Sequence, residues 1–222
     1  MAKKNTMPLL FEQEYWKKNY SDPLPMDCIG NARQHAAYMQ FFFGLDLIDI
    51  NSVIDFGVGL AFLFREVIKK FMPEHAVAID PSVYALTRAK RRLLPPVSSM
   101  KLDVHNIDLC AWAKGMGKRG PVFDLGLCTS VLQYLNEEEL HLVLPVMARK
   151  VRYLYLTVPT DKEMNRMKKE VDFFDSYALA RSREFYLNIL HPHFTVIGRR
   201  LLESKAHFSE RDTFCSELLF RF

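Results

Sequence analysis

The chain has 222 residues, of which 49% are hydrophobic and 25% are charged, and its formal net charge is +4. These values are typical of a soluble globular protein and exclude a disordered chain, and the length suits one domain with a single core. The mild positive charge allows an anionic partner but is far below that of an obligate nucleic-acid binder.

The four cysteines are isolated along the chain, at Cys28, Cys110, Cys128 and Cys215. They form no Cys-x-x-Cys pair and no Cys/His spacing of a zinc site, so we expect no bound metal. Isolated thiols indicate a reducing compartment. The sequence has no apolar run near the roughly 20 residues of a membrane span and no signal peptide, which together predict a cytoplasmic protein without a membrane partner.

Residues 1–51 are predicted to form a helical extension. A first short helix ends before Pro23, and a second begins after Asn31 as N-cap and ends at Gly44. Aromatic residues are frequent in both, and they either pack on the core or form a lid over a ligand site. Those of the first helix are Phe11, Tyr15, Trp16 and Tyr20, and those of the second are Tyr38, Phe41, Phe42 and Phe43.

The rest of the chain is organised around a strand, a glycine turn and a helix. Residues 53–56 indicate a short buried strand, and Gly57 and Gly59 follow it. Apolar residues then recur over residues 60–71 with the period of an amphipathic helix, which Pro73 ends. Glycines allow a sharp turn and the close approach of a ligand, and a helix N-terminus presents unpaired N–H groups.

A second strand over residues 76–79 is followed by Asp80, which lies 23 residues after Gly57. An acid at the tip of the second strand, about 20 residues beyond a glycine turn, accepts hydrogen bonds from the ribose hydroxyls of a nucleoside. A glycine turn that only packs a helix on a sheet does not need this acid. The combination therefore predicts a nucleoside-binding site.

The residues of the turn distinguish among nucleosides. A dinucleotide fingerprint needs a third glycine where this chain has Phe62. Instead, Asp55 precedes Gly57 by two residues, and Asp-x-Gly-x-Gly followed by Ala61 resembles motif I of the class I S-adenosylmethionine-dependent methyltransferases. Ala61 departs from the glycine that is frequent there in the family. The resemblance covers residues 52–222 and implies an α/β fold, a Rossmann-like doubly wound seven-stranded sheet that is mostly parallel with an antiparallel C-terminal strand.

The cofactor that the resemblance implies is S-adenosylmethionine. In the family, an acid followed by an apolar residue after the third strand binds adenine. Asp103–Val104 match that pattern, and Asp108 is the alternative. The cofactor-binding residues that the resemblance implies are Asp55, Phe56, Gly57, Gly59, Asp80, Pro81, Asp103, Val104, Cys128 and Thr129.

A predicted fourth strand over residues 122–128 and the segment after it resemble the family's fourth motif. Many small-molecule members have Glu-His where this chain has Gln133–Tyr134, so no general base is assigned and the catalytic residues stay unknown. Methyl transfer from a sulfonium depends mainly on positioning, so a missing base does not exclude activity. The residues implied to border the acceptor are Tyr15, Trp16, Gln133, Tyr134 and Thr157.

The remaining elements follow from capping signals and apolar runs. Asn136 with Glu139 predicts a capping box at the start of a helix that Pro145 kinks or divides. The other expected elements are a helix after Ser82, a fifth strand over 151–158, a helix from Ser182 to Leu190, a sixth strand from Phe194 toward Leu202, and a closing antiparallel strand from Phe214 to Phe220.

Absent motifs narrow the acceptor. The chain has no Asn/Asp-Pro-Pro-Tyr/Phe after the fourth strand, and Cys128 follows Leu127 rather than the proline of a Pro-Cys nucleophile. We therefore expect a small-molecule acceptor, with a protein or RNA as alternatives. Two rival functions remain, a non-catalytic methyltransferase-like partner-binding subunit and an NAD-linked oxidoreductase, and Phe62 and Asp55 argue against the second.

Overall fold

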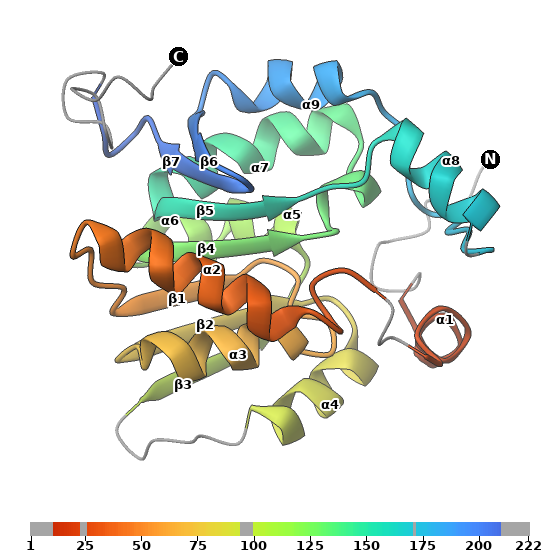
Figure 1. Ribbon diagram of the computed structural model, residues 1–222, viewed down its shortest axis with the longest axis horizontal. Coiled ribbons are helices and arrows are strands. Elements are labelled where there is room, and N and C mark those ends of the chain that lie inside the picture. The colour runs from red at the N-terminus through yellow and green to blue at the C-terminus, as the bar shows by residue number, and fades with distance from the viewer. Residues whose placement is uncertain (1–10, 23–25, 94–99, 171, 210–222) are drawn as a thin grey trace. The chain divides into compact units, whose positions relative to one another are not determined.

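The computed structural model describes residues 11–22, 26–93, 100–170 and 172–209 (Figure 1). In these ranges the strands are β1 (Ser52–Asp55), β2 (His75–Asp80), β3 (Lys101–Asn106), β4 (Phe123–Thr129), β5 (Val151–Thr157), β6 (Phe194–Gly198) and β7 (Leu201–Ser204). The helices are α1 (Gln13–Asn19), α2 (Ala32–Leu45), α3 (Phe62–Phe71), α4 (Val83–Arg92), α5 (Leu109–Lys114), α6 (Met116–Arg119), the 3₁₀ turn η2 (Leu132–Tyr134), α7 (Glu137–Lys150), α8 (Asp161–Glu170) and α9 (Arg183–Leu190).

These strands form a mixed seven-stranded sheet in the order β3-β2-β1-β4-β5-β7-β6. Helices follow most strands along the chain, so the expected Rossmann-like α/β fold is confirmed. None of the helices in the described ranges combines the length and the apolar content that crossing a membrane requires.

By its internal contacts the chain divides into two compact units, Met1–Leu109 and Cys110–Phe222. In the first unit, β1 and β3 both pair in parallel with β2. Helices α2 and α3 lie side by side (Figure 1). Met39 and Phe43 of α2 are fully buried, whereas Phe41 is 80% exposed, so only part of its aromatic set packs on the core.

In the second unit, β4 and β5 pair in parallel, while β7 is antiparallel to both β5 and β6. The expected continuous sixth strand toward Leu202 is wrong, because the chain reverses at Arg200 and returns as β7. Arg200 has φ 67, the left-handed region that ends an extended strand. The closing strand predicted from Phe214 to Phe220 lies outside the described residues.

Helix α7 begins with the predicted capping box. The Asn136 Oδ1 accepts from the Glu139 N–H at 2.9 Å, and the Glu139 Oε2 accepts from the Asn136 N–H at 2.8 Å. The helix then continues through Pro145 to Lys150, so the predicted division is wrong. Pro145 removes one internal hydrogen bond, and burial of one face of the helix, which includes Leu144, offsets that loss.

Candidate functional site

The first unit contains a tight turn between β1 and α3. The Val58 N–H donates to the Ile79 carbonyl at 3.0 Å, and the Ala61 N–H donates to the Val58 carbonyl at 2.8 Å. Gly59 and Ala61 have φ values of 50 and 59, both in the left-handed region. Glycine adopts that region freely, whereas alanine does so at a cost of roughly 1–2 kcal/mol. Ala61 therefore adopts the left-handed backbone conformation that glycine favours, although it replaces the glycine that is frequent at this position.

Asp80, the last residue of β2, holds this turn through its carboxylate. Its Oδ2 accepts from the Gly59 N–H and its Oδ1 accepts from the Ser82 N–H, both at 2.8 Å. The side chain is buried, and burial raises the pKa of Asp80 to about 6, although both backbone hydrogen bonds act to lower it. The sequence predicted an acid at the tip of β2, and the structure joins that acid directly to the glycine turn.

Asp55, the last residue of β1, is a second buried carboxyl beside this turn. Burial raises the pKa of Asp55 to about 8; the hydrogen bond from the Gly57 N–H, at 3.2 Å, opposes this rise, and the charge of Asp80 adds to it. Asp55 therefore exists largely as the neutral acid at pH 7. A cation placed beside it would favour the ionised form.

Helix α1 covers the turn with aromatic side chains. The Trp16 Nε1–H is shared between the Ser82 hydroxyl at 2.8 Å and the Phe11 carbonyl at 3.0 Å. A Cβ at position 59 would lie 3.2 Å from Trp16 Cη2, so the indole ring packs on the space that glycine leaves. Tyr15 and Trp16 are both buried, so these two aromatics pack on the unit, and a lid role for the segment stays a prediction.

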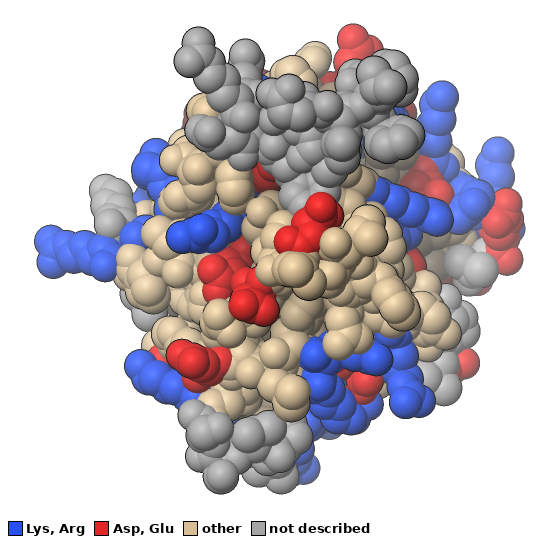
Figure 2. Space-filling view, turned by 60° about the vertical axis from the view of Figure 1, so that its left-hand side comes forward, with Lys and Arg blue, Asp and Glu red and all other residues tan. Residues whose placement is uncertain are grey.

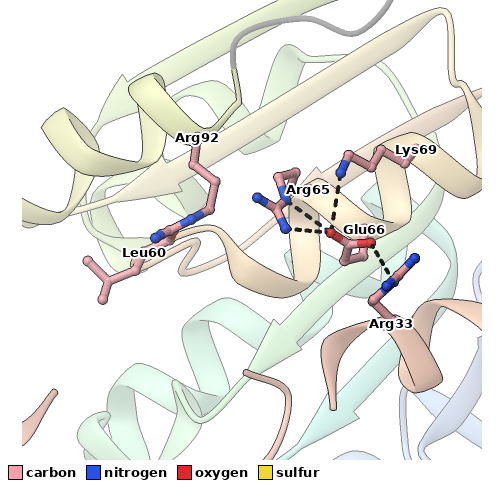
Figure 3. Close-up of polar contacts among 6 residues, drawn as sticks. All are labelled: Arg33, Leu60, Arg65, Glu66, Lys69 and Arg92. Atoms are coloured by element: carbon pink, nitrogen blue, oxygen red, sulfur yellow. Dashed lines mark hydrogen bonds and ion pairs between the residues drawn. The ribbon is translucent and has the colours of Figure 1, made fainter. Parts of the chain in front are cut away.

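Three cationic side chains surround Glu66 of α3, and one of them comes from α2 (Figure 3). The Glu66 carboxylate lies 2.8 Å from Arg65, 3.6 Å from Lys69 and 3.9 Å from Arg33. Although burial acts to raise it, the pKa of Glu66 is lowered by the hydrogen bond from Arg65 and by the charges of Lys69 and Arg65. Arg65 and Lys69 lie on α3 with Glu66, whereas the largely exposed Arg33 lies on α2, so one of these three contacts links α2 to the helix that starts at the glycine turn.

Arg92, at the end of α4, attaches a third helix to the turn. Its guanidinium donates to the Leu60 carbonyl (Figure 3). It also lies 3.8 Å from the centre of the Phe62 ring. A cation over an aromatic face is attracted by the ring quadrupole. Phe62, where a dinucleotide fold has glycine, therefore has a structural partner in this chain.

The sequence analysis expected Asp103 to follow the third strand, but the structure places Asp103 within that strand. It is the third residue of β3, and its Oδ2 lies 3.0 Å from His75 Nε2 and 3.1 Å from Lys101 Nζ. The hydrogen bond from His75 is the main cause that lowers the pKa of Asp103. His75 begins β2, whereas Asp80 ends it, so Asp103 lies toward the other end of the strands from the glycine turn.

The end of β3 instead brings Asn106 to Asp80. The Asn106 side chain donates to the carbonyls of Asp80 at 3.1 Å and Pro81 at 2.8 Å, and the Ile107 N–H donates to the Asp80 carbonyl at 3.2 Å. Asp108 follows directly. Asp108, the alternative in the sequence analysis, is thus the acid that follows the end of β3.

In the second unit, the expected site residues gather at the carboxyl ends of β4 and β5. Thr129 and Thr157 are register partners, and the Ser130 N–H donates to the Thr157 carbonyl at 2.9 Å. Cys128 is fully buried. Parallel strands present their carboxyl ends at one edge of the sheet, where ligands of open α/β folds bind.

Gln133 and Tyr134 occupy the 3₁₀ turn that follows β4. The Tyr134 hydroxyl donates to Asp175 Oδ2 at 2.7 Å, and the Leu179 N–H donates to the Gln133 carbonyl at 2.8 Å. The Gln133 side chain is only 3% exposed, and its Oε1 has no hydrogen-bond partner among the described residues. A buried acceptor without a donor is destabilising, so this oxygen requires an explanation.

Two other buried polar atoms share that property, the Arg181 Nη1 and the Tyr186 hydroxyl, again within the described ranges. Burial raises the pKa of Tyr186, while the nearby Arg181 guanidinium acts to lower it. The sequence analysis did not select Arg181, which lies in the segment after β5. Charged residues are frequent in that segment, and no spacing signal distinguishes the buried one.

Several solved structures have this fold. One is an S-adenosylmethionine-dependent methyltransferase from Clostridium acetobutylicum, with TM-score 0.64 and 11% identity over 86% of this chain and 96% of that one. Another is the N-methyltransferase NodS from Bradyrhizobium japonicum with S-adenosyl-L-homocysteine, with TM-score 0.62 and 14% identity over 86% and 97%. A third is magnesium protoporphyrin IX methyltransferase from Synechocystis, with TM-score 0.57 and 17% identity over 86% and 96%.

No family model matches the chain, and no curated protein matches it in sequence. At 11–17% identity, the structural comparisons establish the fold. The chain therefore has the Rossmann-like fold of the S-adenosylmethionine-dependent methyltransferases, as motif I predicted.

Proposed function

We propose that the protein is an S-adenosylmethionine-dependent methyltransferase acting on a small molecule. The observation that carries this proposal is the Asp80 carboxylate at the tip of β2, held by the N–H groups of Gly59 and Ser82. Residues 52–222 would form the catalytic part, and residues 1–51 would cover the cofactor. We also propose a cytoplasmic location, which the isolated thiols of the sequence indicate.

The residues beside the turn fit the cofactor. Each Asp80 oxygen accepts one backbone hydrogen bond and retains a lone pair for a ribose hydroxyl. With a pKa of about 6, Asp80 is largely ionised at neutral pH and is a strong acceptor. Asp55 would be ionised by a cationic group such as the ammonium of the cofactor. Gly57, Gly59 and Phe56 would allow that group to approach the backbone.

S-adenosylmethionine would supply a methyl group on a sulfonium sulfur; an O, N or other nucleophile would bond to that methyl carbon in line as the S–CH₃ bond breaks and S-adenosylhomocysteine leaves. The chain needs to orient the two reactants and exclude water, and positioning alone contributes roughly 7–11 kcal/mol to such reactions. Trp16, which is buried and lies against Gly59 and Ser82, would exclude water from the Asp80 side. No residue is assigned as a general base.

Adenine recognition is proposed to involve the end of β3 and the residues after it. Asp108 is supported by its place two residues beyond Asn106, which contacts Asp80 and Pro81. Asp103, with Val104, is a weaker candidate because it is paired with His75 and Lys101. At the ends of β4 and β5, Cys128, Thr129 and Thr157 would border the cofactor and the acceptor.

A polar small molecule is the acceptor that the second unit supports best. Gln133 carries a buried oxygen without a partner in the described ranges, and an acceptor molecule with a matching donor would pair with it. On the face drawn in Figure 2, Lys and Arg side chains are interspersed with Asp and Glu, which does not create the single-sign field of a nucleic-acid surface there.

A second candidate function is a methyltransferase-like subunit that binds a partner and does not catalyse methyl transfer. One observation favours it: the Trp16 ring lies 3.2 Å from the position of a Cβ at Gly59, in space that a ligand of the glycine turn would approach. In this alternative, α1 remains on the turn permanently.

Calorimetric titration of the full chain with S-adenosylmethionine, S-adenosylhomocysteine and NAD tests the proposal. We expect saturable 1:1 binding of the first two and none of NAD. A panel of small acids, amines and phenols with labelled methyl donor then identifies the acceptor class. Absence of binding by both sulfur nucleosides would overturn the proposal, and binding without transfer to any acceptor would favour the second candidate.

A further inference from the structure

A cluster of three metal-ligating side chains lies just before and within the first turn of α2. The ligand atoms of Asp27, Cys28 and His35 all lie within 4.8 Å of one another. His35 Nε2 is 2.9 Å from Asp27 Oδ1, and Cys28 Sγ is 3.8 Å from Asp27 Oδ2. A carboxylate, an imidazole and a thiol are therefore directed to one point.

The Asn31 side chain holds the first two ligands in place. Its Nδ2 donates to Asp27 Oδ1 at 2.9 Å, and its Oδ1 accepts from the Cys28 N–H at 2.7 Å. The helical backbone positions the third ligand, because the His35 N–H donates to the Asn31 carbonyl at 3.1 Å. Such outer contacts orient the ligands of natural metal sites.

The cluster is buried on one side and open on the other. Cys28 is 6% exposed and the His35 side chain 13%, whereas the Asp27 side chain is 49% exposed. A metal ion here would have three ligands from the protein and a fourth position toward solvent at Asp27, where water can bind. Three protein ligands with an open position form a common zinc arrangement.

We propose that Asp27, Cys28 and His35 bind one Zn²⁺ ion. Zinc takes thiolate, imidazole and carboxylate ligands, and at its usual bond lengths tetrahedral geometry separates such ligand atoms by about 3.3–3.5 Å. The His35–Asp27 and Cys28–Asp27 separations lie within a few tenths of an ångström of that range. Because all the ligand atoms lie within 4.8 Å of one another, no separation would have to close by more than roughly 1.5 Å.

This inference is independent of the proposed function, because none of the three ligands belongs to the candidate cofactor site. It differs from the expectation of no metal, which rested on the absence of paired Cys and His motifs. Here the ligands are two adjacent residues and a histidine on the following helix. A motif based on Cys and His pairs does not detect that arrangement.

Cobalt(II) titration of the chelator-treated, reduced full chain tests the site. Cobalt substitutes for zinc, and thiolate ligation produces a charge-transfer band in the near ultraviolet. We expect the band to saturate at one equivalent and to disappear on addition of Zn²⁺. Cys28→Ser and His35→Ala should each weaken metal binding roughly 100-fold or more, and Asn31→Ala, which removes a supporting contact, about 10–100-fold.

Cys110→Ser is the matched control, since that thiol lies outside the cluster, and it should leave the band unchanged. Far-ultraviolet circular dichroism identifies variants that fail to fold, and Asp27→Asn provides a milder ligand variant that keeps the side-chain shape. A wild-type chain without the charge-transfer band would overturn the proposal. An undiminished band in a folded Cys28→Ser variant would do the same.

Discussion

The indole Nε1–H of Trp16 donates to the Ser82 hydroxyl at 2.8 Å, although the two residues are 66 positions apart in the chain. The Ser82 N–H in turn donates to the Asp80 carboxylate. One serine therefore connects the N-terminal helix α1 to the acid that we propose holds the ribose. Any movement of α1 away from the glycine turn must break the Trp16 bond.

Removing the Trp16 indole should open the covered side of the turn. We expect Trp16→Ala to raise both the association and the dissociation rate of S-adenosylmethionine, because ligand exchange would no longer require α1 to move. Stopped-flow fluorescence measures both rates. Trp16→Phe is the matched control, since it keeps a ring over Gly59 but loses the bond to Ser82. Unchanged rates in Trp16→Ala would exclude a covering role for α1.

Removing the Asp80 carboxylate should weaken cofactor binding at least about tenfold, because hydrogen bonds to a charged group contribute about 1.5–3 kcal/mol. Calorimetry on Asp80→Ala and on the milder Asp80→Asn measures the loss. Asp124→Asn is the control. Asp124 lies at the start of β4 and pairs with Arg152 of β5, and it is not among the proposed cofactor-binding residues. Equal affinity in the folded Asp80 variants and the wild type would remove the central assignment.

The two adenine candidates separate in a direct comparison. We expect Asp108→Asn to weaken binding of S-adenosylhomocysteine by about tenfold or more, through loss of a charge-assisted hydrogen bond. Asp103→Asn should leave that affinity unchanged, since Asp103 lies within β3 and pairs with His75 of β2. The reverse result in equilibrium titrations would restore Asp103 as the adenine-binding acid.

Burial of Asp55 makes stability depend on pH. Its pKa rises from 3.8 to about 8 on folding, so between those values the folded chain retains a proton that the unfolded chain has lost. The free energy of unfolding should therefore fall as pH rises from about 4 to 8, by at most about 1.4 kcal/mol per pH unit.

Asp55→Asn removes this dependence without removing the oxygen that accepts from Gly57. We expect the variant to be more stable than the wild type at pH 8, with a smaller difference at pH 5. Urea midpoints at the two pH values measure the effect. Asp80, with its pKa raised to about 6, contributes in the same direction up to that pH in both proteins. A constant difference across the range would contradict the prediction.

Replacing Gln133, whose side-chain oxygen is buried without a partner in the described ranges, should increase stability and decrease methyl transfer. Gln133→Met fills the same volume without a buried acceptor, so the free energy of unfolding should rise by about 1 kcal/mol. Transfer to the acceptor should decline while cofactor affinity is retained. Denaturant titration and calorimetry test the two parts. Lower stability in the variant would mean that the amide is a structural contact.

Several features of this protein could be predicted from sequence because they depend on residues close together in the chain. The turn at Gly57 and Gly59, the acid Asp80 after the second strand and the Asn136–Glu139 capping box are all in place. Side-chain periodicity and capping chemistry act within a few residues, so local sequence determines them.

Tertiary structure decided what depends on contacts between distant segments. Asp103 is drawn into β3 by pairing with β2, and Trp16 lies on Gly59 because α1 folds back on the turn. Strand register and side-chain packing are set by the whole unit, and the order of residues along the chain does not specify which distant side chains meet.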